Sequence, residues 1–214
     1  MIEYYDEARK AVLCMTIIGI TGQSGSGKGY LANEFAKLGY IHADADKIYH
    51  ALLDESQALR QELIREFGNE IESGGKIDRK VLGAKVFGKK NARKLLRLNK
   101  IAHKYVCKEY IKLIMEAKAN GEKGIIIDAP LLIEAGLDKI CDTCICVAAS
   151  EDIRTERIMK RDRITEEQAK LRINSQKQLL FYSSKCEYIF LNDGSSDAAS
   201  FAKSIDEIHG GNNE

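Results

Sequence analysis

The sequence predicts an α/β fold in which a five-stranded parallel sheet is flanked by helices. Short apolar runs bounded by turn residues alternate with longer stretches whose apolar residues repeat at helical spacing. This alternation is typical of parallel strands joined by crossover helices. Only one proline, Pro130, is present, so few positions break long elements. The expected strands are residues 16–21, 39–43, 124–128, 143–147 and 188–191.

Helices are expected between these strands. The first, residues 28–38, places Leu31, Phe35 and Leu38 at helical spacing. The stretch between the second and third strands is far longer than a crossover requires, which predicts an inserted helical subdomain. The segment between the fourth and fifth strands leaves room for a lid. The remaining expected helices are residues 45–70, 79–88, 91–119, 151–160 and 165–180.

Composition excludes several classes of protein. The chain has 214 residues, of which 44% are hydrophobic and 30% are charged, so neither wholesale disorder nor a collagen-like repeat is expected. With 33 basic and 32 acidic residues the net charge is +1, which gives no general attraction to nucleic acid or to an anionic membrane. At about 150 residues per domain, this length predicts one domain with insertions.

The sequence also predicts neither a membrane span nor a signal peptide. No apolar run approaches the roughly 18 residues of a membrane span. Residues 1–14 lack a basic segment followed by an apolar core, so they are expected to be an extension and not a signal peptide. We therefore expect a cytoplasmic protein, a monomer or small homo-oligomer, whose six cysteines are mostly thiols.

A phosphate-binding loop is predicted directly after the first strand. Residues 22–28 read GQSGSGK, which fits G-x-x-x-x-G-K between a strand and a helix. Glycines let successive backbone N–H groups turn toward a phosphate, and the following helix N-terminus adds a partial positive charge. Lys28 would reach the β- and γ-phosphates. The alternative is a glycine-rich turn with a solvated lysine. The expected phosphate ligands are Gly22, Gly25, Ser26, Gly27 and Lys28.

The two residues after Lys28 depart from the pattern. Gly29 stands where a Mg²⁺-binding serine or threonine belongs, and Tyr30 follows it. A phenol cannot replace a short hydroxyl beside the phosphates. We expect Mg²⁺ to be held by water and carboxylates instead, with weakened catalysis as the alternative.

Carboxylates are expected at the carboxyl ends of two strands. Asp44 and Asp46 follow the second strand, and Asp128 ends the third. Ligands of open α/β sheets bind beyond these ends. Asp44 is expected to orient an acceptor hydroxyl and to help place Mg²⁺ together with Asp128. The alternative is that Asp44 and Asp46 cap the next helix and that Asp128 only ends its strand.

Arginines recur on one face of a predicted helix. Arg154, Arg157 and Arg161 are spaced i, i+3 and i+7. In a phosphotransferase, arginines of a mobile segment neutralise the charge of the transferred group, and we assign this to Arg157 and Arg161. The alternative is a solvated face paired with nearby acids.

Two further clusters are interpreted structurally. Residues 89–104 form a basic amphipathic helix, with Leu95, Leu96 and Val106 expected on its core face. The basic face of this helix would either be exposed to solvent without a ligand or attract an anionic substrate by its positive charge. Cys141, Cys144 and Cys146 lack a second Cys or His pair nearby, so they are expected to be small buried thiols and not a zinc site.

Motifs in a fixed order resemble one family. They are IIGITGQSGSGKG at 17–29, DADKI at 44–48, GKIDR at 75–79, DAPLLIE at 128–134 and RIMKRD at 157–162. With Asn192-Asp193-Gly194 they resemble the dephospho-CoA kinase family over about residues 15–195. The phosphate loop alone is common to many activities, whereas the ordered set is much more specific.

The resemblance implies a P-loop kinase fold and ATP-dependent, Mg²⁺-assisted phosphorylation of the ribose 3′-hydroxyl of dephospho-CoA. ATP contacts would extend over Gly29, Tyr30 and Asn192. The residues implied to contact the acceptor are Asp44, Asp46, Arg79 and His103. Residues 15–45, 121–150 and 186–214 would form the nucleotide-binding core, 46–120 the CoA-binding insertion and 151–185 the lid region.

Two other functions remain open on the sequence. One is another small-molecule or nucleotide P-loop kinase, although the R-G-G motif of shikimate kinases is missing. The other is a nucleotide-binding module that has lost turnover, which Gly29 and Tyr30 motivate.

Overall fold

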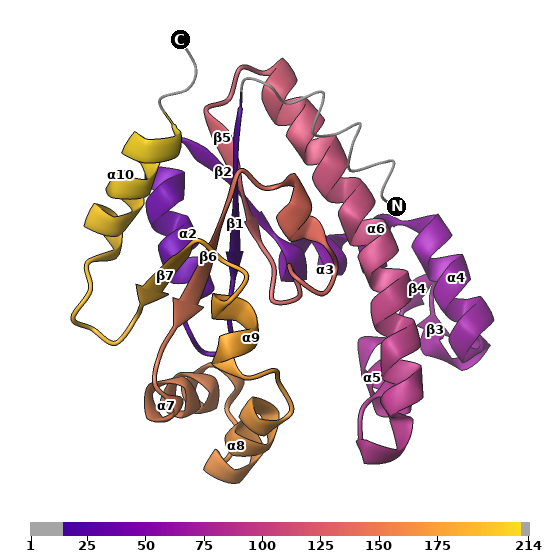
Figure 1. The fold of residues 1–214 in the computed structure, drawn as a ribbon. Helices are drawn as coiled ribbons and strands as arrows, with labels where there is room; N and C mark the ends of the chain where they lie inside the picture. Colours follow the sequence, from indigo (N-terminus) through magenta and orange to yellow (C-terminus); the bar gives the residue numbers. More distant parts are fainter. Residues whose placement is uncertain (1–14, 211–214) are drawn as a thin grey trace. The chain divides into compact units, whose positions relative to one another are not determined.

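The computed structural model describes residues 15–210 of the chain (Figure 1). The chain divides into two compact units. The first contains the described residues up to Asp44 together with those from Leu113 onward, and the second is Ala45–Lys112. No described helix combines the length and the low polarity needed to cross a lipid bilayer. The expected extension at residues 1–14 lies outside the described residues.

The first unit is built on a five-stranded sheet in the order β2-β5-β1-β6-β7. Each strand pairs parallel to its neighbours, as the sequence predicts. Every residue of the three central strands is buried, because helices and connecting segments cover both faces. The strands are β1 (Thr16–Thr21), β2 (Tyr40–Asp44), β5 (Gly124–Asp128), β6 (Thr143–Ala148) and β7 (Tyr188–Leu191).

One face of the sheet is covered by α2 (Lys28–Lys37) and α10 (Ala198–His209), which lie side by side in Figure 1. Leu31 and Phe35 of α2 pack with Ile18 and Ile20 of β1, and all four side chains are fully buried. The sequence interpretation missed α10, although Asp197 caps its N-terminus by accepting from two backbone N–H groups.

Three more helices follow β6. They are α7 (Glu151–Asp162), α8 (Glu166–Asn174) and α9 (Leu179–Ser183). A single helix was expected at 165–180, and the structure divides it into α8 and α9. Ile158, Ala169 and Ile173 form a small separate core between α7 and α8. A short 3₁₀ helix, η3 (Leu137–Ile140), precedes β6.

The second unit has its own hydrophobic core. The expected helix at 45–70 is divided at Ser56, whose Oγ accepts from Leu59 N at 3.2 Å and thereby caps the second part. The elements are α3 (Ala45–Glu55), α4 (Gln57–Phe67), η1 (Asn69–Ile71), β3 (Glu72–Ser73), β4 (Lys76–Ile77), α5 (Arg79–Val86) and η2 (Lys89–Asn91). Strands β3 and β4 form a short antiparallel hairpin.

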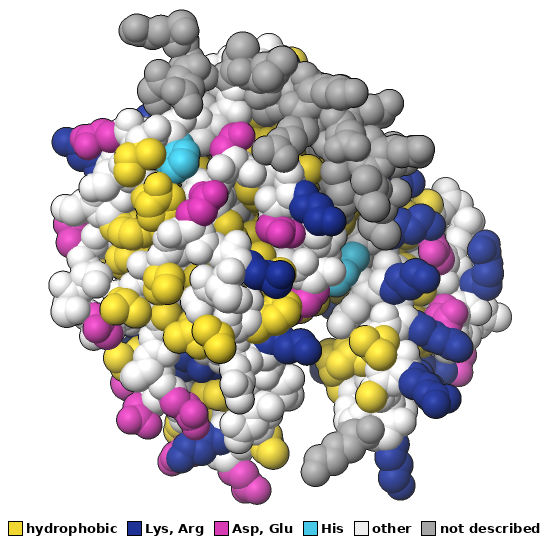
Figure 2. All heavy atoms as spheres, viewed as in Figure 1, with side chains coloured by type: hydrophobic (Ala, Val, Ile, Leu, Met, Phe, Trp, Pro, Cys, Tyr) yellow, Lys and Arg dark blue, Asp and Glu magenta, His cyan; other side chains and the backbone are white. Residues whose placement is uncertain are grey.

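The longest helix is α6 (Ala92–Ala119), which begins in the second unit and continues into the first. Its expected core face is partly wrong, because Leu96 is 69% exposed while Leu98 and Ile101 are buried. The basic residues lie outside as predicted, and blue side chains are frequent on this part of Figure 2. Arg97 and Lys104 form ion pairs with Glu66 and Glu62 of α4, so this surface is partly neutralised within its own unit.

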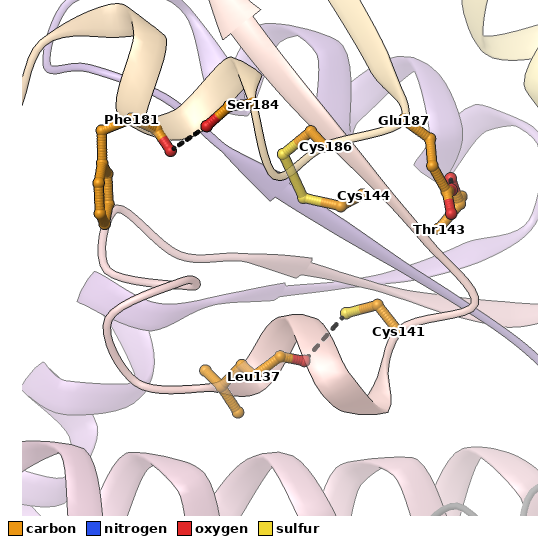
Figure 3. The surroundings of a disulfide bond; sticks show 8 residues. All are labelled: Leu137, Cys141, Thr143, Cys144, Phe181, Ser184, Cys186 and Glu187. Carbon is orange, nitrogen blue, oxygen red and sulfur yellow. Dashed lines mark hydrogen bonds between the residues drawn. A yellow bond between two sulfur atoms is a disulfide. The ribbon is translucent and has the colours of Figure 1, made fainter.

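The structure corrects the interpretation of Cys144. Figure 3 shows it joined to Cys186 by a disulfide, with a Cα–Cα distance of 4.6 Å. Because β6 and β7 run parallel, Cys144 lies opposite the segment that enters β7, and Glu187 N donates to Cys144 O. Cys107, Cys141 and Cys146 are buried thiols, as expected. Over residues 15–210, these cysteines are not among the side chains grouped closely enough to hold a metal ion.

Reduction of this disulfide is expected to expose two additional thiols and to destabilise the fold. The bridge closes a loop with a sequence separation of 42. By the chain-entropy estimate, such a loop contributes up to about 4 kcal/mol. Thiol titration in denaturant, with and without prior reduction, gives the count, and chemical denaturation gives the stability. In the Cys186→Ser control, reductant should change neither quantity; equal thiol counts in the wild type would exclude the disulfide.

Candidate active site

The predicted phosphate loop, residues 22–28, connects β1 to α2. Gly22, Gly25 and Gly27 have positive φ angles of 140°, 80° and 93°. Gly27 is the N-cap of α2 in the left-handed conformation, where a side chain is unfavourable. The loop therefore depends on glycine at the positions that the sequence motif requires.

Two hydroxyl groups at the loop are buried without a hydrogen-bond partner in the described part of the chain. They are Thr21 Oγ1, at the end of β1, and Ser26 Oγ, and both residues are 0% exposed. Buried polar groups are normally satisfied by protein, water or ligand. A loop with such groups fits a site that a phosphate-bearing ligand completes.

Lys28 opens α2 and lies close to β6. Its Nζ donates to Gly22 O at 3.2 Å, which folds the side chain back over the loop. Burial raises the pKa of the Cys146 thiol to about 11, and the Lys28 ammonium opposes this shift. The charge of Lys28 is thus directed to the inside of the loop, where a bound phosphate is predicted to lie.

Arg154 of α7 supports the start of the loop. Its Nε donates to Ser24 O at 3.0 Å and its Nη1 donates to Gln23 Oε1 at 2.7 Å. The residue is only 4% exposed, and burial lowers the pKa of its guanidinium. The sequence interpretation assigned it no role, because its partners lie about 130 residues earlier in the chain.

Arg157 and Asn192 support the end of the loop. Asn192 Nδ2 donates to Ser26 O at 2.8 Å, and Arg157 Nη1 donates to the same oxygen at 3.2 Å. Arg157 Nη2 also donates to Asn192 O at 3.1 Å. A trans peptide directs its C=O and N–H oppositely, so the Gly27 N–H points away from these supports. This is the orientation that a phosphate cradle needs.

Residues 151–185, which the sequence predicts to be a lid, also contact the loop beyond α8. Ser24 N donates to Gln176 Oε1 at 2.9 Å, and Gln23 Nε2 donates to Lys177 O at 3.0 Å. The backbone N–H of Ser24, one of the loop's donors, is therefore already hydrogen-bonded to the Gln176 side chain. Arg161 instead pairs with Asp162 at 2.8 Å, and its side chain is 58% exposed. The expected contacts of Arg157 and Arg161 with a transferred phosphoryl group stay predictions.

Asp44 and Asp128 lie beside each other at the carboxyl ends of β2 and β5, where they pair in register. His42, two residues before Asp44, joins them. One ligand atom from each of the three side chains lies within 4.8 Å of the others, which makes this a group that could hold a metal ion. His42 was missed, although strand alternation places residues 42 and 44 on one face.

Gly29 lies next to this group. A Cβ atom built on Gly29 would lie 3.7 Å from Asp128 Oδ2, which is an ordinary van der Waals distance. The first turn of α2 thus approaches the carboxylates at the position where the usual hydroxyl is missing. Tyr30, the next residue, is 50% exposed.

Three residues implied for the acceptor belong to the second unit. Asp46 is exposed in the first turn of α3. Arg79 pairs with Asp54 at 2.9 Å and donates to His50 O. Burial lowers the pKa of His103 on α6. Their contacts with a substrate stay predictions.

Replacing Arg154 by methionine is expected to raise the KM for ATP by about tenfold or more, with a smaller change in kcat. The substitution removes two charged hydrogen bonds to the loop, each of about 1.5–3 kcal/mol, while keeping an apolar stem. Fluorescent-nucleotide titration and steady-state kinetics measure the effect. Arg65→Met, on an exposed position of α4, is the control, and an unchanged KM for Arg154→Met would contradict the supporting role.

Comparison with known proteins identifies the family. The family model described as dephospho-CoA kinase matches residues 16–198. A dephospho-CoA kinase of Bacillus licheniformis is 36% identical over 180 residues, covering 84% of this chain and 89% of its own. The dephospho-CoA kinase of Fusobacterium nucleatum is 40% identical over 165 residues, covering 77% and 82%.

A solved structure has a similar fold over most of the chain. The protein TT1252 of Thermus thermophilus superposes with a TM-score of 0.75 at 27% identity, covering 91% of this chain and 97% of its own. The family-model match over residues 16–198 includes the phosphate loop, both strand-end aspartates and the helix that carries Arg154 and Arg157. The chain therefore belongs to the dephospho-CoA kinase family.

Proposed function

We propose that this chain transfers the γ-phosphoryl group of ATP to the ribose 3′-hydroxyl of dephospho-CoA, giving CoA and ADP. The family relationship supports the choice of substrates. The observation that carries the chemistry is the placement of the Asp44–Asp128 pair beside the first turn of α2, directly after the phosphate loop. Donor phosphates and an acceptor carboxylate then meet at one end of the sheet.

On the donor side, the loop amides and Lys28 bind the β- and γ-phosphates. Arg154, Arg157 and Asn192 act from behind by holding loop carbonyls, so the amides need no reorganisation when ATP binds. Contacts of Gly29, Tyr30 and Asn192 with the nucleotide itself remain part of the proposal.

On the acceptor side, Asp44 accepts the proton of the ribose hydroxyl, or orients that hydroxyl for in-line attack on the γ-phosphorus. The hydroxyl oxygen forms a bond to phosphorus as the bond to the β–γ bridging oxygen breaks, and ADP leaves. Asp128 lies in register beside Asp44, so both carboxylates can serve one site.

A divalent ion such as Mg²⁺ fits this donor set, because two carboxylates and the nearby phosphates supply the oxygen ligands it prefers. When bound, the ion would neutralise part of the negative charge of the phosphates. Asp44 and Asp128 would hold it.

The remaining assignments extend the proposal to the whole chain. The second unit, with Asp46, Arg79 and His103, contacts the CoA portion of the acceptor. The lid region closes over the transferred group, which excludes water and brings Arg161 to the phosphates. A cytoplasmic location, the absence of nucleic-acid partners and a monomer or small oligomer stay predictions.

The reaction is tested by coupled ADP release with purified protein, ATP, Mg²⁺ and dephospho-CoA. ADP release should depend on dephospho-CoA and vanish in Lys28→Ala, which loses the charge at the phosphates. Lys37→Ala, at the exposed end of the same helix, is the matched control and should keep wild-type activity. Tight binding of ATP without any dependence of ADP release on dephospho-CoA would refute this substrate.

Gly29 and Tyr30 favour one alternative function, a nucleotide-binding module without turnover. The double variant Gly29→Ser, Tyr30→Thr separates the two. The serine fits, because a Cβ at position 29 has only Asp128 Oδ2 within 4 Å, at 3.7 Å. We expect kcat to change by less than about threefold, since carboxylates already hold the ion. A sharp rise from a negligible rate would support the degenerate module.

A further inference from the structure

His42 places a nitrogen donor among the carboxylates of the proposed metal site. Its Nε2 lies 3.3 Å from Asp128 Oδ2, and the two side chains are 12% and 9% exposed. The imidazole is therefore held at the site, and its nearest described partner is one of the two carboxylates. A histidine in this environment can be a ligand of the ion or a hydrogen-bond partner of Asp128.

The positions of the three donor side chains favour His42 as a ligand of the ion. His42 and Asp44 lie on the same face of β2, and the register places Asp44 beside Asp128 of β5. That face is the one covered by α2, whose Gly29 approaches Asp128 Oδ2. All three donors thus lie where α2 and the phosphate loop begin, and not in the apolar interior.

His42 adds to the two carboxylates a nitrogen donor, which Mg²⁺ does not favour. Mg²⁺ takes oxygen ligands in a nearly octahedral arrangement, whereas imidazole suits later first-row ions such as Fe²⁺, Ni²⁺ and Zn²⁺. The chain lacks the short hydroxyl that would supply one of those oxygens, because Gly29 and Tyr30 occupy its positions. An imidazole nitrogen stands next to the same carboxylate that the hydroxyl would approach.

We propose that His42, Asp44 and Asp128 together bind a divalent first-row transition metal ion, with His42 as a direct nitrogen ligand, in preference to Mg²⁺. The proposal rests on the proposed function only in that the ion accompanies the phosphates of ATP. It predicts that the metal preference of this chain is set by His42, while the phosphate loop sets the affinity for the nucleotide.

Pulsed electron paramagnetic resonance of bound Mn²⁺ tests the ligand directly. The probe is Mn²⁺ with inorganic pyrophosphate, which supplies phosphate oxygens but no nitrogen. The wild-type protein should show a ¹⁴N coupling that changes to the ¹⁵N pattern when only histidine is labelled with ¹⁵N. Histidine occurs four times in the chain, so His42→Gln should abolish the coupling and His50→Gln, an exposed position on α3, should keep it.

Metal affinity provides a second readout. His42→Gln should weaken Ni²⁺ binding by about tenfold or more and leave Mg²⁺ binding within about twofold, since imidazole suits Ni²⁺ and not Mg²⁺. Displacement of bound Mn²⁺ by each ion in turn, followed by the free Mn²⁺ signal, measures the two affinities. If the Gln variant fails to fold, His42→Asn replaces it, and the absence of a ¹⁵N-histidine coupling in the wild type would by itself overturn the proposal.

The outcomes separate this proposal from the kinase function. Bound Mn²⁺ without nitrogen coupling, or no binding of Mn²⁺, overturns the metal proposal even if ADP release depends on dephospho-CoA. A nitrogen coupling lost only in His42→Gln supports the metal proposal even if no such ADP release occurs. An equal loss of Ni²⁺ and Mg²⁺ affinity in His42→Gln would instead make His42 a positioning residue for Asp128 and contradict direct ligation.

Discussion

Replacing Asp44 by asparagine is expected to lower kcat by about 10²–10⁴-fold, the usual contribution of a positioned general base. Asparagine keeps the size of the side chain and an oxygen acceptor but cannot take a proton. Asp44 also belongs to the cluster with His42 and Asp128, so the change removes one negative charge from the proposed metal site. We expect the KM for ATP to change much less, because the loop binds the donor phosphates.

Asp46→Asn is the matched control for this prediction. Asp46 lies two residues further on, is exposed in the first turn of α3, and is proposed to contact the acceptor. Its replacement should change kcat by less than about tenfold, as expected for a group that binds without proton transfer. Steady-state kinetics with both substrates varied, together with single-turnover rates, measure both variants. A larger loss for Asp46→Asn than for Asp44→Asn would reverse the assignment.

Gly27→Ala is expected to abolish ATP binding, with a loss of at least about a hundredfold in affinity. A Cβ at Gly27 would lie 2.0 Å from Asn192 Nδ2, and φ is 93°. Asn192 is buried and bonded to Ser26 O, so it cannot move without releasing the loop. The methyl group would therefore displace the support that directs the Gly27 N–H toward a phosphate.

Gly39→Ala separates this clash from conformational strain. Gly39 follows the same helix and has the same φ of 93°, but its nearest heavy atom would be Lys123 Cδ at 4.0 Å. It should cost about 1 kcal/mol of stability, as expected for a left-handed residue that gains a Cβ, and leave kcat and KM unchanged. Isothermal titration with ATP and thermal denaturation compare the two variants. Equal ATP affinity in both would show that the contact with Asn192 is dispensable.

The sequence was sufficient to predict the central sheet, because its three buried central strands are continuous apolar runs. Strands β1, β5 and β7 begin and end at the expected residues. The division at Ser56 was missed because apolar residues continue at helical spacing on both sides of it. Only the cap at Ser56, a local hydrogen bond, interrupts the helix.

The phosphate loop and strand-end aspartates were predictable because their spacing and flanking elements are local. The supports of the loop were not, because Arg154 and Asn192 reach residues more than a hundred positions earlier. An arginine that recurs on a helix face is usually solvated, and nothing local shows that Arg154 is buried. The pairing of Cys144 with Cys186 likewise depends on two strands that meet only in the folded sheet.

The strand order has a consequence for how this chain folds during synthesis on the ribosome. Within residues 15–210, β1 pairs only with β5 and β6 and β2 pairs only with β5, so Thr16 cannot pair until Gly124 has been synthesised. Roughly 100 residues at about 5–20 residues per second correspond to some 5–20 s in which β1 and β2 have no strand partner. The second unit, complete by Lys112 and with its own core, can fold within that interval. We therefore expect nascent chains to expose apolar strands after the second unit has folded, and chaperone demand to be greatest just before β5 emerges.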